Sequence, residues 1–160
     1  MRLSIALFCL LLAPPSFASQ YPLDQAVQII PRAEAKRLRR AGVRTTLDIL
    51  TRGRTEAGRQ QLAASSKLAP ERVMELTALA DLLRVRGIGP DVARLLTAVG
   101  VRTIADLQRA DPNLTAQAIL DVNKARRLSQ NPPGAPSLGY WIRVSRDLPI
   151  VLEIPPLEVH

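Results

Sequence analysis

Residues 83–96 read Leu-Arg-Val-Arg-Gly-Ile-Gly-Pro-Asp-Val-Ala-Arg-Leu-Leu, with two glycines between two stretches of helical composition. Gly87 and Gly89 permit a positive φ, which predicts a tight turn, and Ile88 between them is expected to point inward and hold that turn. Ala93 is small enough to let the two helices approach closely. The stretch therefore predicts a helical hairpin in an all-α fold.

The same hairpin predicts an anion-binding site made by the main chain. Backbone N–H groups at the start of the helix that begins at Pro90 lack partners within that helix, and the helix dipole places positive charge there. A phosphate group is the expected guest, and phosphate contacts dominate nucleic-acid affinity without reading base sequence. The residues expected to bind it are Gly87, Ile88, Gly89, Arg86 and Arg94. The alternative is that Gly-Ile-Gly only turns the chain and that the arginines are a solvated face.

The hairpin belongs to one of two matching parts of the chain. Residues 42–49, Gly-Val-Arg-Thr-Thr-Leu-Asp-Ile, align with residues 100–107, Gly-Val-Arg-Thr-Ile-Ala-Asp-Leu, at an offset of 58 residues. The match extends backwards and predicts an internal duplication. The predicted repeats cover about residues 27–50 and 85–108. Pro31 stands where the second repeat has Gly89, so one of the two expected phosphate-binding turns is missing.

Each matching segment predicts the end of one helix and the start of the next. Gly42 and Gly100 stand where a helix stops in the left-handed conformation that glycine adopts most easily. Thr45 and Thr103 follow as N-caps, with an aspartate three residues later, which is the pattern of a capping box. These aspartates are therefore expected to be structural rather than catalytic.

Three more helices are expected around the repeats, and no alternating strand pattern lies between them. Thr55 caps a short helix that runs to about residue 64, and Pro70 suits the first turn of a longer helix that runs to about residue 84. A third helix starts at Asp111 or Thr115 and reaches about residue 128. Residues 19–128 are therefore expected to form one compact helical domain.

The C-terminal part of the chain has a different composition. Residues 129–139 are rich in proline and glycine, which predicts a linker without regular helix. Residues 140–160 are expected to hold a short helix, ending at about residue 146, and an irregular apolar tail. Within that tail, residues 150–154 have the composition of a strand, but a lone strand cannot form a sheet.

The N-terminus has the layout of a secretory signal peptide. Arg2 is followed by a run over residues 3–13 that is apolar except for Ser4, then by a Pro-Pro pair and a small-residue site that ends at Ala18. Residues 1–18 are therefore predicted to be a signal peptide cleaved near Ala18, which leaves an exported protein in the periplasm or outside the cell. A run of eleven residues is too short for the roughly 20 that span a bilayer, so no stable membrane span is expected after cleavage.

Composition argues against an enzyme. The chain has 160 residues and a net charge of +8, which fits one small basic domain, and its apolar fraction of 47% is too high for a disordered chain. The only cysteine, Cys9, lies in the predicted signal peptide, and the only histidine, His160, is the last residue. No cluster has the spacing of a metal site, a P-loop or a dinucleotide-binding loop. We therefore expect no catalytic residues, no metal and no cofactor.

Several spaced features together are more specific than the Gly-Ile-Gly turn alone. They are Ala35-x-x-Leu38-x-x-Ala41-Gly42-Val43, Gly58-Arg59-x-x-Leu62-Ala63, Ala80-Asp81-Leu82-Leu83-Arg84-Val85-x-Gly87-Ile88-Gly89, Ala98-x-Gly100-Val101-x-Thr103, and Trp141-Ile142 before Leu148-Pro149. On this pattern, over about residues 27–149, the chain resembles the bacterial domain-of-unknown-function family 4332, a tandem helix-hairpin-helix domain. The resemblance implies a compact all-helical fold related to nucleic-acid-binding hairpins, in a family without an assigned activity.

Two functions from different classes fit these observations. The first is a non-enzymatic exported module that binds DNA or another phosphate backbone weakly and without sequence preference, through the hairpin amides. The alternative is a protein-interaction or scaffold module of the cell envelope, with Tyr140, Trp141 and residues 150–154 as its contact surface. In that alternative the tail adds to the sheet edge of a protein partner.

Overall fold

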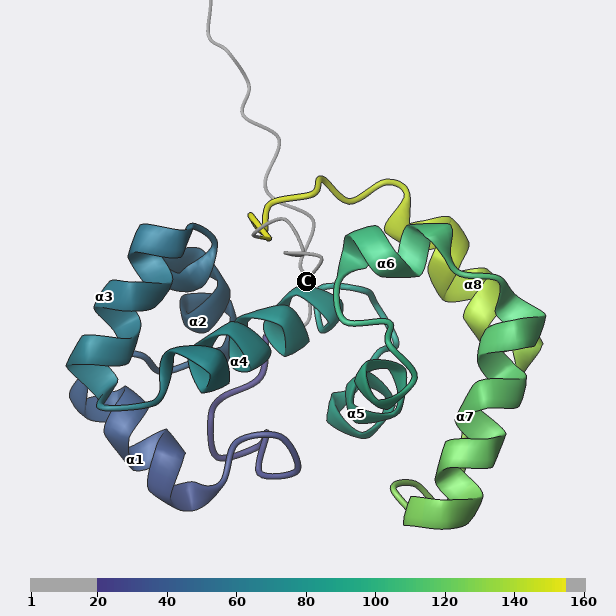
Figure 1. Cartoon of the computed structure of the whole chain (residues 1–160), viewed down its shortest axis with the longest axis horizontal. Coiled ribbons are helices and arrows are strands. Elements are labelled where there is room, and N and C mark those ends of the chain that lie inside the picture. The colour runs from purple at the N-terminus through teal and green to yellow at the C-terminus, as the bar shows by residue number, and fades with distance from the viewer. Residues whose placement is uncertain (1–19, 155–160) are drawn as a thin grey trace, which may run out of the picture.

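Eight α-helices make up the part of the chain that the computed structural model describes, residues 20–154, and no β-strand occurs among them (Figure 1). The helices are α1 (Arg32–Arg40), α2 (Thr46–Gly53), α3 (Glu56–Ser66), α4 (Pro70–Leu82), α5 (Pro90–Ala98), α6 (Ile104–Arg109), α7 (Pro112–Arg126) and α8 (Ala135–Ser145). The expected all-α class is confirmed. The predicted signal peptide, residues 1–18, and the end of the tail with His160 lie outside the described residues.

The two expected helix stops have the same backbone geometry. Gly42 ends α1 with φ +81° and Gly100 ends α5 with φ +90°. In both turns the residue after the glycine donates its N–H to a carbonyl five residues back, at 3.0 Å in the first and 2.9 Å in the second. A helix that stops in this way satisfies its last carbonyls without a side chain. The glycine positions alone therefore predicted both helix ends.

The helices that follow these turns both begin with a capping box. The Thr45 hydroxyl accepts the Asp48 N–H at 3.1 Å, and the Thr103 hydroxyl accepts the Asp106 N–H at 3.2 Å. Each aspartate in return accepts the N–H of its threonine. The structural role expected for the two aspartates is confirmed.

Helix α4 is the central element of the core. It packs against α2 and α3 on one side and against α5 on the other, so it lies between the α1–α3 group and the α5–α8 group (Figure 1). Its apolar side chains belong to one buried cluster with residues of both groups, and Leu76 and Leu82 are almost completely enclosed. Burying a leucine contributes about 1.5–3 kcal/mol. Both groups therefore share one hydrophobic core.

The C-terminal helix begins earlier than the sequence predicted. Helix α8 starts at Ala135, with Gly134 as its N-cap and Pro136 in its first turn, so the last five residues of the expected 129–139 linker are helical. Proline in the first turn costs nothing, because its missing N–H would have no partner there and its φ already suits a helix. The prediction treated Pro136 as a helix breaker, which holds only inside a helix.

The tail returns to the body of the domain. Leu152 is buried, and the Glu153 N–H donates to the Arg54 carbonyl at 2.8 Å, just after α2. The strand composition of residues 150–154 does not produce a strand in the described residues. Between residues 20 and 154, no helix has both the length and the apolar character needed to cross a membrane.

Candidate nucleic-acid interface

The turn between α4 and α5 has the buried centre that the sequence predicted. Val85 and Ile88 are both completely buried, and the Ile88 N–H donates to the Val85 carbonyl at 3.0 Å. Gly87 has φ +96°, a conformation that other residues adopt at a cost. Ile88 therefore points inward and Gly87 makes the turn, as expected.

Two details of this turn differ from the prediction. Gly89 has φ −94° and ψ 176°, an extended conformation open to any residue, so it does not need to be glycine for its backbone. The Ile88 N–H is bonded inside the turn and is not available to a phosphate. This hydrogen bond gives the buried Ile88 N–H its acceptor within the turn.

Helix α5 begins with open donors. Gly89 is its N-cap and makes no side-chain cap, and the N–H groups of Gly89, Asp91 and Val92 have no acceptor among the described residues. Pro90 has no N–H to offer. Asp91 is exposed in the same turn and its negative charge disfavours an anion there. The donors without an acceptor therefore lie at the start of α5, and Ile88 is not one of them.

Trp141 lies against the hairpin and not on the exposed contact surface that the protein-interaction alternative assigned to it. Helix α8 carries this side chain, which is 8% exposed, to the turn. A Cβ atom added to Gly87 would lie 2.9 Å from the indole Nε1, and that N–H has no acceptor among the described residues. Tyr21 approaches the other glycine, with its hydroxyl 3.8 Å from the position of a Cβ on Gly89. Two aromatic side chains thus bring polar atoms to the hairpin.

The arginines near the hairpin have different surroundings. Arg86 is exposed and has no acidic partner among the described residues. Arg84 is bound on both sides, because its guanidinium donates to Asp81 at 2.8 Å and to the Pro149 carbonyl at 3.0 Å. Arg94 lies one turn into α5, half-buried on the wall of a pocket. Arg86 and Arg94 are therefore free to attract an anion, and Arg84 is not.

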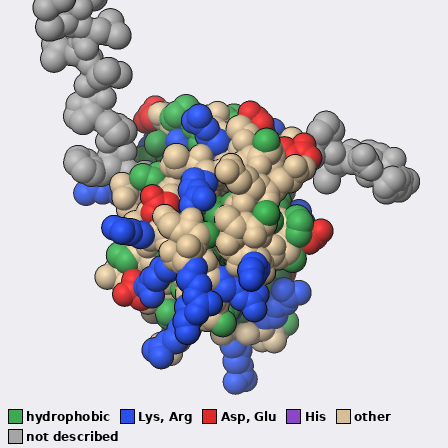
Figure 2. All heavy atoms as spheres, turned by 90° about the vertical axis from the view of Figure 1, so that its left-hand side faces the viewer, with side chains coloured by type: hydrophobic (Ala, Val, Ile, Leu, Met, Phe, Trp, Pro, Cys, Tyr) green, Lys and Arg blue, Asp and Glu red, His purple; other side chains and the backbone are tan. Residues whose placement is uncertain are grey.

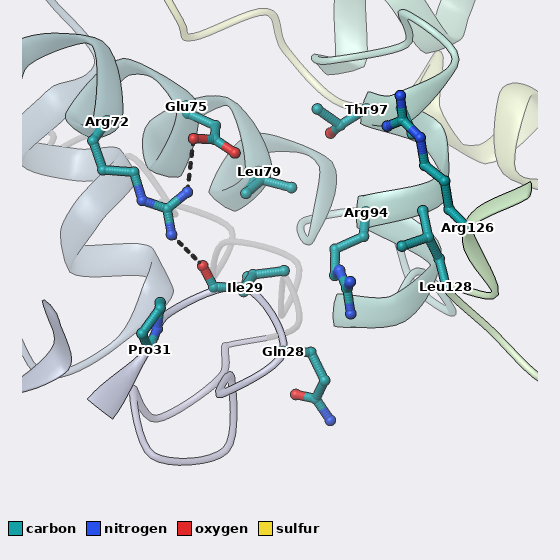
Figure 3. Close-up of a pocket in the computed structure, with 11 residues that line it drawn as sticks. Gln28, Ile29, Pro31, Arg72, Glu75, Leu79, Arg94, Thr97, Arg126 and Leu128 are labelled. Atoms are coloured by element: carbon teal, nitrogen blue, oxygen red, sulfur yellow. Dashed lines mark hydrogen bonds and ion pairs between the residues drawn. The ribbon is translucent and has the colours of Figure 1, made fainter. Parts of the chain in front are cut away.

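That pocket has a volume of about 340 Å³ and lies between the start of α1, α4, α5 and the end of α7 (Figure 3). Arg72 in its wall is held by Glu34 at 2.8 Å and by Glu75 at 2.7 Å. Burial alone lowers the pKa of Arg72, but its hydrogen bonds to the two glutamates outweigh burial and raise that pKa, so the cation stays charged. The lining residues are Gln28, Ile29, Pro31, Arg72, Glu75, Leu79, Arg94, Thr97, Ala98, Arg126 and Leu128.

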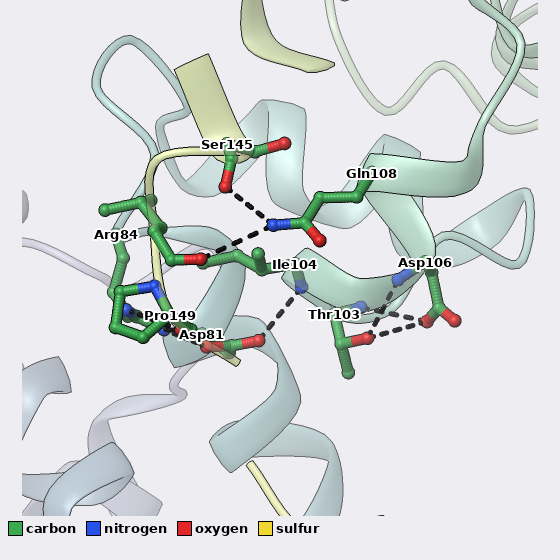
Figure 4. Close-up of polar contacts among 9 residues, drawn as sticks. Asp81, Arg84, Thr103, Ile104, Asp106, Gln108, Ser145 and Pro149 are labelled. Atoms are coloured by element: carbon green, nitrogen blue, oxygen red, sulfur yellow. Dashed lines mark hydrogen bonds and ion pairs between the residues drawn. The ribbon is translucent and has the colours of Figure 1, made fainter. Parts of the chain in front are cut away.

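Asp81 holds the second group of helices together from inside the core. It is 1% exposed, and its carboxylate accepts the Ile104 N–H at 2.9 Å as well as the Arg84 guanidinium (Figure 4). Because Arg84 also binds the Pro149 carbonyl, this contact ties α4 to the start of α6 and to the tail. Asp81 is therefore a buried, ion-paired residue with a structural role.

Positive charge gathers on α1, which the sequence search for a binding site passed over. Five of its nine residues are basic, and all five are exposed. Figure 2 shows lysine and arginine side chains gathered on the lower part of the face on which α1 lies. Residues 32–53 hold seven basic and two acidic residues, a net charge of +5, whereas the matching residues 90–111 hold three of each, a net charge of zero.

Comparison with known proteins gives one match. A family model described as Domain of unknown function (DUF4332) matches residues 28–148. No curated protein and no solved structure matches this chain. Within the described residues, no group of three or more His, Cys, Asp or Glu side chains is placed to hold a metal ion.

Proposed function

We propose that this chain, which belongs to the DUF4332 family of domains of unknown function, is a non-enzymatic exported module that binds a phosphate backbone, DNA in particular, at the hairpin before α5. In this proposal residues 27–50 and 85–108 are tandem helix-hairpin-helix repeats, and only the second keeps a glycine hairpin. Binding is weak and independent of base sequence, since main-chain donors contact phosphates and not base edges.

The observation that carries the proposal is a group of donors without acceptors around one turn. The N–H groups of Gly89, Asp91 and Val92 point from the start of α5, where the helix dipole also favours an anion. The Trp141 indole N–H stands beside Gly87 from a side chain that is otherwise enclosed. A phosphate oxygen is an acceptor that main-chain and indole donors can share.

The basic side chains supply attraction at longer range. Arg86 lies within the turn and Arg94 one helical turn beyond it, and neither is consumed by a carboxylate in the described residues. Together they offset Asp91, whose charge opposes binding. If the hairpin neutralises two or three phosphates, it contributes about −2 to −3 to the slope of log affinity plotted against log salt concentration. The dissociation constant for non-specific binding is then about 10⁻⁴ to 10⁻⁶ M.

Gly89→Glu tests the proposal directly. Because Gly89 has an extended backbone and an added Cβ would meet only the Tyr21 hydroxyl at 3.8 Å, this substitution places a carboxylate over the open amides without strain. We expect affinity for duplex DNA to fall at least about tenfold, since a hydrogen bond to a charged group contributes about 1.5–3 kcal/mol. Trp141 is the only tryptophan in the chain, so its fluorescence can report the titration.

Two control variants separate the hairpin from general effects. Gly89→Ala keeps the amides uncovered, and Gly139→Glu adds the same charge on α8, where an added Cβ meets open space. We expect both to bind DNA within about threefold of the wild type, a change of under about 0.7 kcal/mol. Equal weakening by Gly89→Glu and Gly139→Glu would mean that the hairpin makes no specific contact with phosphate.

A second candidate function is protein interaction or scaffolding in the cell envelope. Exposed apolar side chains near the C-terminal end favour it: Tyr140 is 44% exposed, Ile150 61% and Ile154 46%. Deleting the tail is a poor test because Leu152 is buried in the domain. Tyr140→Ser combined with Ile150→Ser is better, since it should abolish capture of an envelope partner and leave DNA affinity unchanged. Capture that survives both substitutions argues against this candidate.

A further inference from the structure

We propose that the exposed face of α1 is a second contact for duplex DNA, made by charge alone. This basic face consists of Arg32, Lys36, Arg37 and Arg40. The inference rests on the proposed function for its ligand, the DNA phosphate backbone, but it uses none of the hairpin residues. It assigns the strongest electrostatic attraction to the part of the chain that lacks the glycine hairpin.

Helix geometry puts the four side chains on one side of α1. Ala35 and Leu38 are the buried residues of this helix and fix its inner side. At about 100° per residue, the four basic positions fall on the opposite half of the helix. All four residues are exposed. The basic face is therefore continuous and open to a large partner.

Little negative charge is left to neutralise this face. The only acidic residue of α1, Glu34, is bound to Arg72 of α4 at 2.8 Å. Arg39, which we leave out of the basic face, is 3.4 Å from Asp24. Arg37 donates to the Lys67 carbonyl at 3.3 Å, which adds a further lysine beside the face.

Repulsion among the cations of the basic face lowers the stability of the unbound domain. Arg32 and Lys36, and then Lys36 and Arg40, are like charges four residues apart on one helix, which destabilises a helix by about 0.2–0.5 kcal/mol per pair. A polyanion removes that repulsion when it binds. The matching helix α5 of the same chain has one basic residue, Arg94, so the charge of α1 is not a general feature of this composition.

The chemistry of the face favours nucleic acid over a lipid surface. A helix that binds a membrane inserts apolar side chains, whereas the apolar side of α1 is buried in the domain and none of the large exposed hydrophobic residues belongs to α1. Three of its four cations are arginine, whose planar guanidinium matches phosphate oxygens. From Arg32 to Arg40 the helix rises about 12 Å, which is comparable to the axial rise of three to four phosphates along one strand.

The test compares two triple variants of equal charge. One is Lys36→Gln/Arg37→Gln/Arg40→Gln on the basic face. The control is Arg102→Gln/Arg126→Gln/Arg146→Gln, which removes three exposed arginines from the other half of the molecule. Glutamine keeps helix propensity, so both variants should fold, and circular dichroism and thermal unfolding confirm this. Binding of duplex DNA is then titrated at 50 and 200 mM salt.

We expect the α1 variant to lose about 2.7 from the magnitude of the salt slope, about 0.9 for each lost phosphate contact. Between the two salt concentrations the wild type then loses about 40-fold more affinity than the variant. The control should change the slope by less than about one. Equal salt slopes for the two variants, or an unchanged slope in the α1 variant, would overturn the proposal. Competition by phosphatidylglycerol vesicles would also overturn it, if the vesicles displace DNA from the wild type but not from the α1 variant, because α1 would then bind lipid.

Gly89→Glu distinguishes this inference from the proposed function. If Gly89→Glu leaves DNA binding intact while the α1 variant loses its salt slope, the basic face stands and the hairpin proposal fails. If only Gly89→Glu weakens binding, the hairpin stands and the basic face fails. Additive losses in the combined variant support both contacts.

Discussion

The two matching parts of the chain, α1–α2 and α5–α6, have the same turn and different surroundings. Their glycines adopt φ +81° and +90°, and their capping threonines have φ −131° and −133°. Yet residues 32–53 carry a net charge of +5 and residues 90–111 carry none. A few residues in a local turn thus keep its geometry, while the helix surfaces beside it are free to diverge.

The partners of the two second helices also differ. In the first part the Thr46 N–H donates to the Tyr21 carbonyl at 2.9 Å. In the second part the N–H of Ile104, the matching residue, donates to the Asp81 carboxylate at 2.9 Å. The same orphan donor is satisfied once by main chain and once by a buried side chain, because a buried N–H needs an acceptor of either kind.

The largest expected effect comes from removing that side chain. Asp81→Ala leaves the Ile104 N–H without an acceptor and Arg84, whose side chain is 10% exposed, without its carboxylate. We expect unfolding in urea to cost about 3–5 kcal/mol less than in the wild type, as for one partner lost from a buried ion pair. Asp121→Ala, on the exposed side of α7, is the control and should change stability by less than about 0.5 kcal/mol. If Asp81→Ala changes the free energy of unfolding by less than about 1 kcal/mol, the buried carboxylate does not distinguish the stability of the second part from that of the first.

The second largest effect distinguishes two glycines with similar positive φ, Gly87 at +96° and Gly100 at +90°. Gly87→Ala strains a residue at φ +96°, at about 1–2 kcal/mol, and also drives a Cβ to 2.9 Å from Trp141, which adds about 1–3 kcal/mol. Gly100→Ala introduces only the backbone strain of a positive φ, since nothing lies within 4 Å of its added Cβ. Thermal unfolding of both variants measures the difference. Equal losses would show that Trp141 moves aside freely.

The smallest expected effect tests whether the capping boxes of the two parts contribute equally to stability. Thr45→Ala and Thr103→Ala each remove one capping hydroxyl from an intact capping box. We expect each to lower the free energy of unfolding by about 1 kcal/mol, with Thr103 slightly above Thr45 because it is 3% exposed. Urea unfolding of the two variants checks this. A difference of more than about 1 kcal/mol would contradict the equivalence of the two caps.

Sequence reasoning identified most of the helices and missed much of the site. Glycine after an apolar helix, and threonine followed by aspartate, act within one turn of the chain, so Gly42, Gly100 and the two capping boxes were predicted from neighbouring residues alone. The prediction allowed a positive φ at both hairpin glycines, but only Gly87 has one, and Gly89 is extended. Helix α8 was expected to begin five residues late, because the proline of a first turn resembles that of a linker.

Contacts between distant segments account for the remaining differences. Trp141 reaches Gly87 from a helix 54 residues further along the chain, and Asp81 reaches Ile104 across 23 residues. No periodicity or spacing near either residue indicates its partner. The basic face of α1 is different, since its residues are neighbours in the sequence, and recognising it required only the knowledge that Ala35 and Leu38 face the core.

By itself the sequence determined the helical class, the positions of the turns and the caps, because these depend on backbone conformations that glycine, proline and threonine select locally. The tertiary structure alone decided which hairpin amides remain open, which arginines are already bound and which side chain covers the turn. Those outcomes depend on how segments far apart in the chain pack around α4, and packing is settled by the shape and burial of the whole core.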